Sequence, residues 1–186
     1  LRGVLDEVLK YKQYYRFGIS LTFPTYLIMP VIEDNVIVYW TSRSYRQYVD
    51  KAKRFKNPHN TNGIGKSNFL YLPYLPNPTI REGFVVEGQF DCIKLISFGV
   101  NTACTFNASP SDMQIRKLIK LFDTINIVYD KDDAGNSGAQ HLSKELHKFG
   151  VETHRIITSV EDAGAYNTRE DFLVDYISRE KMGDKK

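Results

Sequence analysis

The sequence has little cysteine, and the cysteines it has are not arranged to bind zinc. Cys92 and Cys104 are the only two among 186 residues, and neither a Cys-x-x-Cys pair nor a Cys/His cluster accompanies them. A structural zinc module needs such clustered ligands, so we predict no zinc in this chain. Unpaired cysteines are typical of a reducing compartment, and we expect a cytoplasmic protein.

Long apolar runs are also absent. No run approaches the roughly 18–20 residues that span a membrane, and no signal peptide is visible, so we expect no membrane partner. The sequence is 42% hydrophobic and 25% charged, close to the average of globular proteins, which predicts a buried core. The chain begins with Leu rather than Met, which indicates a piece of a longer protein.

The first part of the chain predicts a small α+β subdomain, residues 1–82. Residues 1–17 carry an apolar stripe at helical spacing. Two β-rich runs follow, 26–32 and 35–41, and their short separation predicts a hairpin. Residues 44–68 are polar and basic and are expected to form a long loop.

The second part, residues 83–186, alternates strands with helices. We expect strands at 84–86, 102–105, 125–129 and 153–157, and helices at 90–98, 111–122 and 134–149. Ser109 is expected to cap the second helix, with Pro110 at its first position. The alternation predicts an α/β domain in which helices flank a parallel sheet, and ligands of such sheets bind at the carboxyl ends of the strands.

Carboxylates follow two of these strands. Glu87 stands at the tip of the first strand, with Asp91 one helical turn beyond it, and Asp130 and Asp132 follow the strand at 125–129. In a parallel sheet both tips lie at the same edge. Crowded carboxylates repel each other unless a cation neutralises them, and oxygen ligands suit Mg²⁺ or Mn²⁺.

A simpler alternative is that some of these acids cap helices. Asp132 or Asp133 could cap the helix from 134, and Asp91 could stabilise a helix N-terminus. Capping does not explain Glu87 together with Asp130 and Asp132. Gly88 and Gly135 would let the backbone and a phosphate approach each other closely.

The segment from 43 to 66 is strongly basic. Its only acid is Asp50, and Tyr45 and Phe55 lie among seven basic residues: Arg43, Arg46, Lys51, Lys53, Arg54, Lys56 and Lys66. Basic residues neutralise phosphates and aromatic rings stack on bases, so this pattern favours nucleic-acid binding. On charge alone, a solvated loop explains it equally well.

Two motifs resemble those of TOPRIM domains, a Rossmann-like fold. They are Val-Val-Glu-Gly-x-x-Asp, ending at Asp91, and Tyr-Asp-x-Asp-x-Ala-Gly, ending at Gly135. The resemblance implies that Glu87, Asp91, Asp130 and Asp132 hold or organise a catalytic metal. Primases of this fold add a later Asp-Pro-Asp; here Asp162 matches its first acid and Gly164 replaces the second.

The basic segment resembles the subdomain that precedes TOPRIM in DnaG-type primases. The similarity lies in a strand running on to Arg43, in the run Arg54-Phe55-Lys56-Asn57-Pro58, and in Lys66 with Leu70-Tyr71 behind it. The family has Gly where this chain has Ser42 and Leu72. The resemblance implies that Arg43, Arg54, Lys56, Asn57 and Lys66 grip a nucleoside triphosphate or the template.

The resemblance therefore implies a DNA primase that makes RNA primers by metal-dependent nucleotidyl transfer. Its implied partners are single-stranded DNA, ribonucleoside triphosphates and a replicative helicase, in a bacterial or phage setting. Glu87 could be a metal ligand or a proton acceptor, and Asp91 and Asp162 are candidate further ligands. Two alternatives stay open, a TOPRIM-type nuclease and a non-catalytic nucleic-acid-binding module.

Overall fold

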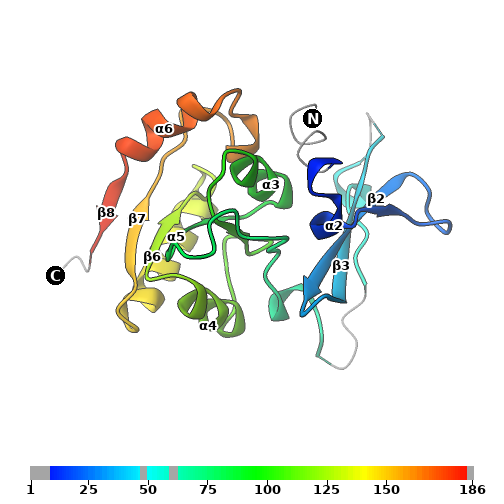
Figure 1. The fold of residues 1–186 in the computed structure, drawn as a ribbon, viewed down its shortest axis with the longest axis horizontal. Helices are drawn as coiled ribbons and strands as arrows, with labels where there is room; N and C mark the ends of the chain where they lie inside the picture. The colour runs from blue at the N-terminus through cyan, green and yellow to red at the C-terminus, as the bar shows by residue number, and fades with distance from the viewer. Residues whose placement is uncertain (1–8, 47–49, 59–62, 184–186) are drawn as a thin grey trace.

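Two sheets lie side by side in the computed structural model, which describes residues 9–46, 50–58 and 63–183 (Figure 1). The smaller sheet is antiparallel, with the order β1-β2-β3, and the larger has the order β5-β4-β6-β7-β8. Helices flank the larger sheet, whose first four strands run parallel. This arrangement confirms the predicted α/β class with a small α+β unit in front of it.

The small sheet is built on one long hairpin. Its strands are β1 (Gly18–Ile19), β2 (Tyr26–Glu33) and β3 (Val36–Ser44). Asp34 and Asn35 form the turn, and both have left-handed backbones, with φ of 49° and 64°. Such turns match the right-handed twist of paired strands, so the hairpin predicted from the sequence forms here.

Only part of the predicted N-terminal helix lies within the described residues. Helix α2 spans Lys12–Tyr15, and residues 1–8 lie outside the description. The expected long loop at 44–68 contains two short 3-10 turns, η1 (Lys51–Lys53) and η2 (Lys66–Asn68). Phe55 also forms an isolated antiparallel bridge with Arg43, so the loop returns along the end of β3.

The large sheet carries four parallel strands and one antiparallel edge strand. The parallel strands are β4 (Glu82–Val86), β5 (Thr102–Cys104), β6 (Thr124–Ile127) and β7 (Glu152–Arg155). The edge strand β8 (Glu180–Met182) pairs antiparallel with β7, and the sequence did not predict it.

Four helices and one short turn complete this unit. They are α3 (Gln89–Ser97), α4 (Asp112–Leu121), α5 (Asp133–His147), η3 (Ala163–Ala165) and α6 (Arg169–Ile177). The predicted cap of α4 at Ser109 is wrong. Ser111 is the cap, because its hydroxyl accepts from Gln114 N at 3.2 Å while Gln114 Oε1 accepts from Ser111 N at 2.9 Å.

Both faces of the large sheet are buried at its inner strand β4. In β4, Phe84 and Val86 join a core cluster with α3 and α6, whereas Val85 joins a second cluster with α4 and α5. A strand buried on both faces reads as a continuous apolar run, which is why this strand was predictable. Cys92 and Cys104 are both free and buried. No helix in the described ranges is long and apolar enough to cross a membrane.

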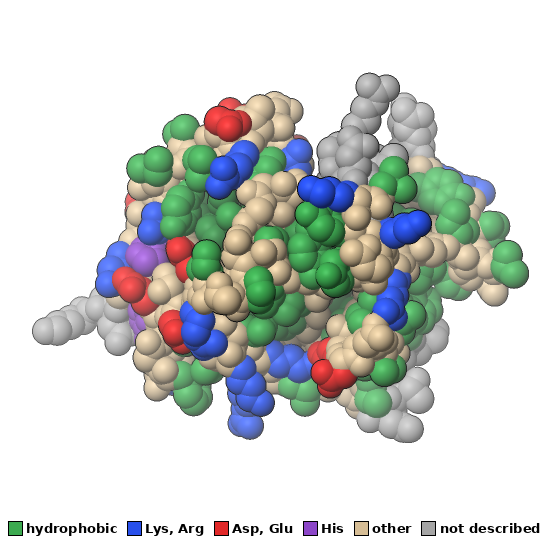
Figure 2. Space-filling model, in the orientation of Figure 1, with side chains coloured by type: hydrophobic (Ala, Val, Ile, Leu, Met, Phe, Trp, Pro, Cys, Tyr) green, Lys and Arg blue, Asp and Glu red, His purple; other side chains and the backbone are tan. Residues whose placement is uncertain are grey.

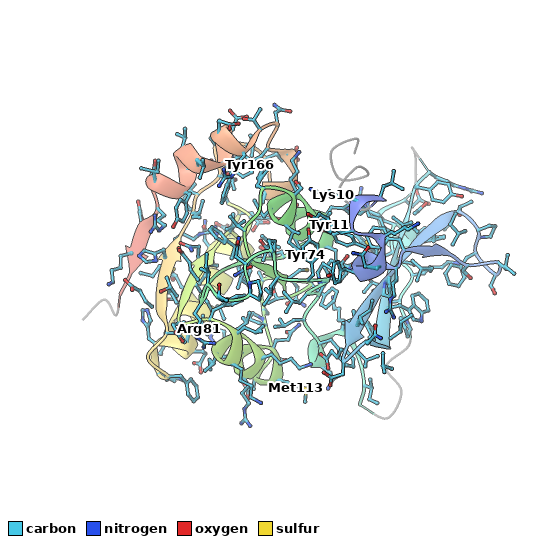
Figure 3. The ribbon with its side chains drawn as sticks, in the orientation of Figure 1. Lys10, Tyr11, Tyr74, Arg81, Met113 and Tyr166 are labelled. Atoms are coloured by element: carbon cyan, nitrogen blue, oxygen red, sulfur yellow. The ribbon has the colours of Figure 1, made fainter. Side chains whose placement is uncertain are left out.

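Tyrosines fill part of the junction between the two sheets (Figure 3). The ring of Tyr74 lies 4.9 Å from those of both Tyr11 and Tyr14, measured between ring centroids. Across the same junction, the Thr41 hydroxyl donates to Gln89 Oε1 and Lys117 pairs with Glu33. We propose residue 82, where β4 begins, as the boundary between subdomains 1–82 and 83–186.

Candidate active site

Glu87 and Asp130 meet at the carboxyl edge of the large sheet. Glu87 directly follows β4, and Asp130 lies three residues beyond β6. Because β4 and β6 are parallel neighbours, both chain segments leave the sheet at the same edge. The Asp130 N–H donates to Glu87 Oε1 at 3.1 Å, which joins the two segments directly.

Asp91 and Asp162 face the same small space. Asp91 lies in the first turn of α3, and its Oδ1 accepts from Gly164 N at 3.0 Å. A Cβ at Gly164 would lie 2.7 Å from Asp91 Oδ1 and 3.2 Å from Asp162 Oδ1. Gly164, which replaces the second acid of the family motif, therefore lies against the carboxylates of Asp91 and Asp162.

Asp132 caps a helix, the alternative that the sequence left open. Its Oδ1 accepts from Gly135 N at 2.8 Å, which makes it the N-cap of α5. At Gly135 a Cβ would lie 2.1 Å from the Asp130 carbonyl oxygen, and at Gly88 it would lie 2.3 Å from Asp91 Oδ2. Both glycines thus make room for the acidic residues, and the close approach of a phosphate to them stays a prediction.

The carboxylates act on one another electrostatically. Burial, with repulsion from Asp162 and Asp130, raises the pKa of Asp91 to about 7. Burial also raises the pKa of Glu87, and the charges of Asp130 and Asp132 add to this. For Asp130 the pKa is raised by burial and then by Asp162 and Asp132. Each of the five predicted acids is therefore linked electrostatically to at least one of the others.

The donor chemistry of this cluster fits a hard divalent cation. All five side chains offer carboxylate oxygens, the ligands that Mg²⁺ prefers, and a cation among them would relieve their repulsion. Within residues 9–46, 50–58 and 63–183, no three His, Cys, Asp or Glu side chains are already arranged to hold a metal ion. The acids are thus collected at one edge, and binding a metal requires their side chains to reorient.

Arg43 reaches from the small sheet to helix α3. Its guanidinium carbon lies 5.3 Å from the ring centroid of Phe90 and 5.6 Å from that of Phe55. Phe90 stands between Gln89 and Asp91 in α3. Arg43 therefore stacks between an aromatic ring of each subdomain, and one of these rings belongs to the residue before Asp91.

Lys66 acts electrostatically on Cys104, a residue that contacts the backbone of Glu87. Burial raises the pKa of Cys104, and the charge of Lys66 offsets part of that rise. The Cys104 thiol lies 3.0 Å from the carbonyl oxygen of Glu87. Lys66 therefore acts on a residue whose thiol contacts the Glu87 backbone.

The other three predicted binding residues contact the small sheet. Lys56 Nζ lies 5.1 Å from the ring centroids of both Phe23 and Tyr26. Asn57 Oδ1 accepts from Ser42 N at 3.4 Å, and the exposed Arg54 accepts from Ser44 N through its carbonyl at 2.9 Å. The structure does not show these three residues at the acidic cluster.

Comparisons with known proteins agree with this geometry. Residues 84–166 match the family model described as Toprim-like. The primase of Aquifex aeolicus, solved with its zinc-binding and RNA polymerase domains, superposes with a TM-score of 0.72 at 20% identity, over 95% of this chain and 47% of that one. The E. coli primase catalytic core gives a TM-score of 0.70 at 17% identity, over 97% of this chain and 60% of that one.

This chain has the catalytic-core fold of a DnaG-type primase. A DNA primase of Aquifex aeolicus is also 30% identical over 111 residues, which are 58% of this chain and 22% of that protein. The chain therefore spans about a fifth of the length of that relative.

Within this primase-core fold, three residues that the sequence analysis did not select approach the acids. Glu161 adds to the negative field on Asp130. Lys131 Nζ donates to the Val160 carbonyl at 3.0 Å, which joins the loop after β6 to the loop after β7. Arg155 Nη2 donates to the Asp130 carbonyl at 3.0 Å.

The sequence did contain a signal for Arg155. It lies inside the predicted strand 153–157, two residues after Thr153 and so on the same face, which the structure shows to be buried. A charged residue there, next to the edge where ligands bind, indicates a role at that edge.

Proposed function

We propose that this chain is the catalytic core of a DNA primase, which synthesises short RNA primers on single-stranded DNA by nucleotidyl transfer. The observation that carries the proposal is the position of Arg43. It stacks on Phe90, the residue that precedes Asp91 in α3, and so brings a cation to the helix that carries one of the acids. A nucleoside triphosphate needs both features, acids to hold its metal and a cation for its phosphates.

We propose that Asp130, Asp132, Asp91 and Asp162 hold Mg²⁺ or Mn²⁺, with Glu87 as a further ligand or as the proton acceptor. The bound ion would neutralise phosphate charge and lower the pKa of the attacking hydroxyl. In the transfer, a ribonucleotide 3′-oxygen forms a bond to the α-phosphorus of the incoming triphosphate. The bond from that phosphorus to the bridging oxygen breaks, pyrophosphate leaves, and the hydroxyl proton passes to a base.

The basic residues divide into two groups by position. Arg43 contacts α3 and Lys66 acts electrostatically on Cys104, and we propose that both hold the triphosphate and the leaving pyrophosphate. Arg54, Lys56 and Asn57 belong to the small sheet and are proposed to contact the template. Lys56 lies over the rings of Phe23 and Tyr26. Such a pair of features suits single-stranded DNA, because the ammonium group can bind a phosphate and the rings can stack on bases.

Single-stranded DNA is the proposed template. A DnaG primase catalytic domain solved bound to single-stranded DNA superposes on this chain with a TM-score of 0.71 at 16% identity, covering 93% of this chain. Ribonucleoside triphosphates are the proposed substrates and a replicative helicase a further proposed partner. The two free, buried cysteines fit the proposed bacterial cytoplasm.

The test is incorporation of labelled ribonucleotides on single-stranded DNA with Mg²⁺ or Mn²⁺, for the chain and for Asp130→Ala. Asp130→Ala is expected to lower incorporation by at least about a hundredfold, because it removes a group of the catalytic site. Cleavage of the DNA that depends on Asp130, without incorporation, would replace this proposal by the nuclease alternative. Binding of DNA without either reaction would support the non-catalytic module.

A further inference from the structure

Arg155 is the one charged side chain classed as buried among the described residues, and it lies behind the acidic edge. Its exposed fraction is 6%, and it is the last residue of β7, the neighbour of β6 (Figure 1). Burying a guanidinium is costly unless its donors are satisfied and nearby acids balance its charge. The position therefore calls for a specific set of partners.

The partners of Arg155 span the turn that carries Asp130 and Asp132. Its Nη1 donates to the Ile127 carbonyl at 3.2 Å, at the end of β6. Its Nη2 donates to the Asp130 carbonyl at 3.0 Å and to Asn136 Oδ1 at 3.3 Å, in the first turns of α5. One planar guanidinium thus joins the strand before the turn, the turn itself and the helix after it, a geometry that lysine cannot reproduce.

The positive charge of Arg155 acts electrostatically on Glu87 and Asp130. Burial lowers the pKa of Arg155, and the charges of Glu87 and Asp130 oppose that change. In the described part of the chain no carboxylate lies within 4.0 Å of its nitrogens, so the hydrogen bonds go to neutral oxygens. The positive charge is left to act on the whole cluster.

We propose that Arg155 is a positioning residue, which fixes the turn from Ile127 to Asn136 so that the Asp130 backbone stays bonded to Glu87. The link is short: Arg155 holds the carbonyl of Asp130, and the N–H of the same residue donates to Glu87 Oε1 at 3.1 Å. Loosening the carbonyl frees the peptide plane next to this bond. The proposal builds on the proposed active site and adds a residue that touches neither metal nor substrate.

The first test measures amide hydrogen exchange in the metal-free protein, which requires no enzymatic activity. Arg155→Lys keeps the charge and Arg155→Met keeps much of the volume. Both are expected to speed exchange of the amides of Asp130 and Gly135 by about tenfold or more, because opening of the turn becomes easier. A failure of primase activity would leave this result untouched, so the two proposals fail separately.

Arg81→Lys is the matched control. Arg81 also makes three hydrogen bonds, two to Asp123 at 2.8 Å and one to the Lys120 carbonyl at 3.2 Å, and it lies beside α4 (Figure 3). Its substitution should leave exchange at Asp130 and Gly135 unchanged. Equal exchange in Arg155→Lys and the wild-type chain, at equal overall stability, would overturn the proposal.

A second variant covers the case in which both Arg155 variants fail to fold. Asn136 is exposed, so Asn136→Ala removes one partner of Arg155 without opening a cavity. It is expected to speed exchange at Asp130 by a smaller factor, about threefold, and no change at Asp130 would count against the proposal.

Where priming is measurable, Arg155→Lys should lower kcat about 10- to 100-fold with KM for nucleotide nearly unchanged.

Discussion

At the scale of single residues, the acids of the candidate site are held by backbone hydrogen bonds. Glu87 accepts from Asp130 N, Asp91 from Gly164 N and Asp132 from Gly135 N. In the described ranges no Lys, Arg or His lies within 4.0 Å of these carboxylates. Backbone hydrogen bonds therefore orient three of the acids, while in this part of the chain no ion pair relieves their mutual repulsion.

This repulsion predicts a stabilising substitution, Asp162→Asn. The charge of Asp162 raises the pKa of the buried Asp91, second only to burial itself, so its removal should stabilise the metal-free protein. We expect the melting temperature at pH 8 with a chelator to rise by about 2–4 °C. Saturating Mg²⁺ should remove this advantage, because the cation pairs with the carboxylate in the wild-type chain.

Asp112→Asn is the control for Asp162→Asn. Asp112 lies exposed in the first turn of α4, where its negative charge favours the helix. Its substitution should not raise the melting temperature. An equal rise in both variants would show that the effect comes from net charge, and a fall in Asp162→Asn would contradict the repulsion argument.

At the scale of the elements, the sequence predicted those with a strong hydrophobic pattern. The apolar runs of β4 and β6 and the spacing of α3, α4 and α5 identified the centre of the large sheet. The edge strand β8 escaped prediction because Glu180 and Lys181 are exposed and carry no apolar pattern. The cap at Ser111 escaped because Ser109-Pro110 offered an equally good start by local preference.

The candidate site, like the secondary structure, could be predicted from the sequence only in part. Strand order brings Glu87 and Asp130 together, so a parallel sheet and two strand tips were enough to predict their proximity. The contacts of Lys56 and Arg155 depend on how side chains orient between segments far apart in the sequence. Strand periodicity carries no information about that orientation.

The packing of α5 depends on a glycine. A Cβ at Gly138 would lie 2.1 Å from the carbonyl oxygen of Ala108, a backbone atom in the loop after β5. Gly138→Ala should therefore push α5 away from this loop and cost about 1–3 kcal/mol, seen as a lower urea midpoint. Exposed Ser137→Ala in the same helix should cost little, and equal stability of both variants would contradict the close packing.

At the scale of the whole molecule, the proposed site draws on both sheets. The large sheet supplies the acids, and the small sheet supplies Arg43 and, at its outer end, exposed hydrophobic side chains (Figure 2). Ile19 and Leu21 are among these, with exposed fractions of 61% and 99%. The basic and acidic halves meet at α3, where Thr41 bonds to Gln89 and Arg43 stacks on Phe90.

If the small sheet supplies the cation of the proposed site, Arg43 should contribute to binding of the triphosphate. Arg43→Ala should raise KM for ribonucleoside triphosphate about 10- to 100-fold, because a charged hydrogen bond to phosphate contributes about 1.5–3 kcal/mol. Arg43→Lys should recover only part of this, since lysine keeps the charge and loses the stacked plane. Exposed Arg46→Ala is the control, and equal effects in both alanine variants would indicate a diffuse electrostatic field.

The most direct measurement of the central claim is the sequence and length of the product made on a single-stranded DNA of known sequence. With ribonucleoside triphosphates and Mg²⁺, this account predicts short RNAs complementary to the template, made by the wild-type chain and lost in Asp130→Ala. Shortened template strands that depend on Asp130, or RNA whose sequence is independent of the template, would contradict it.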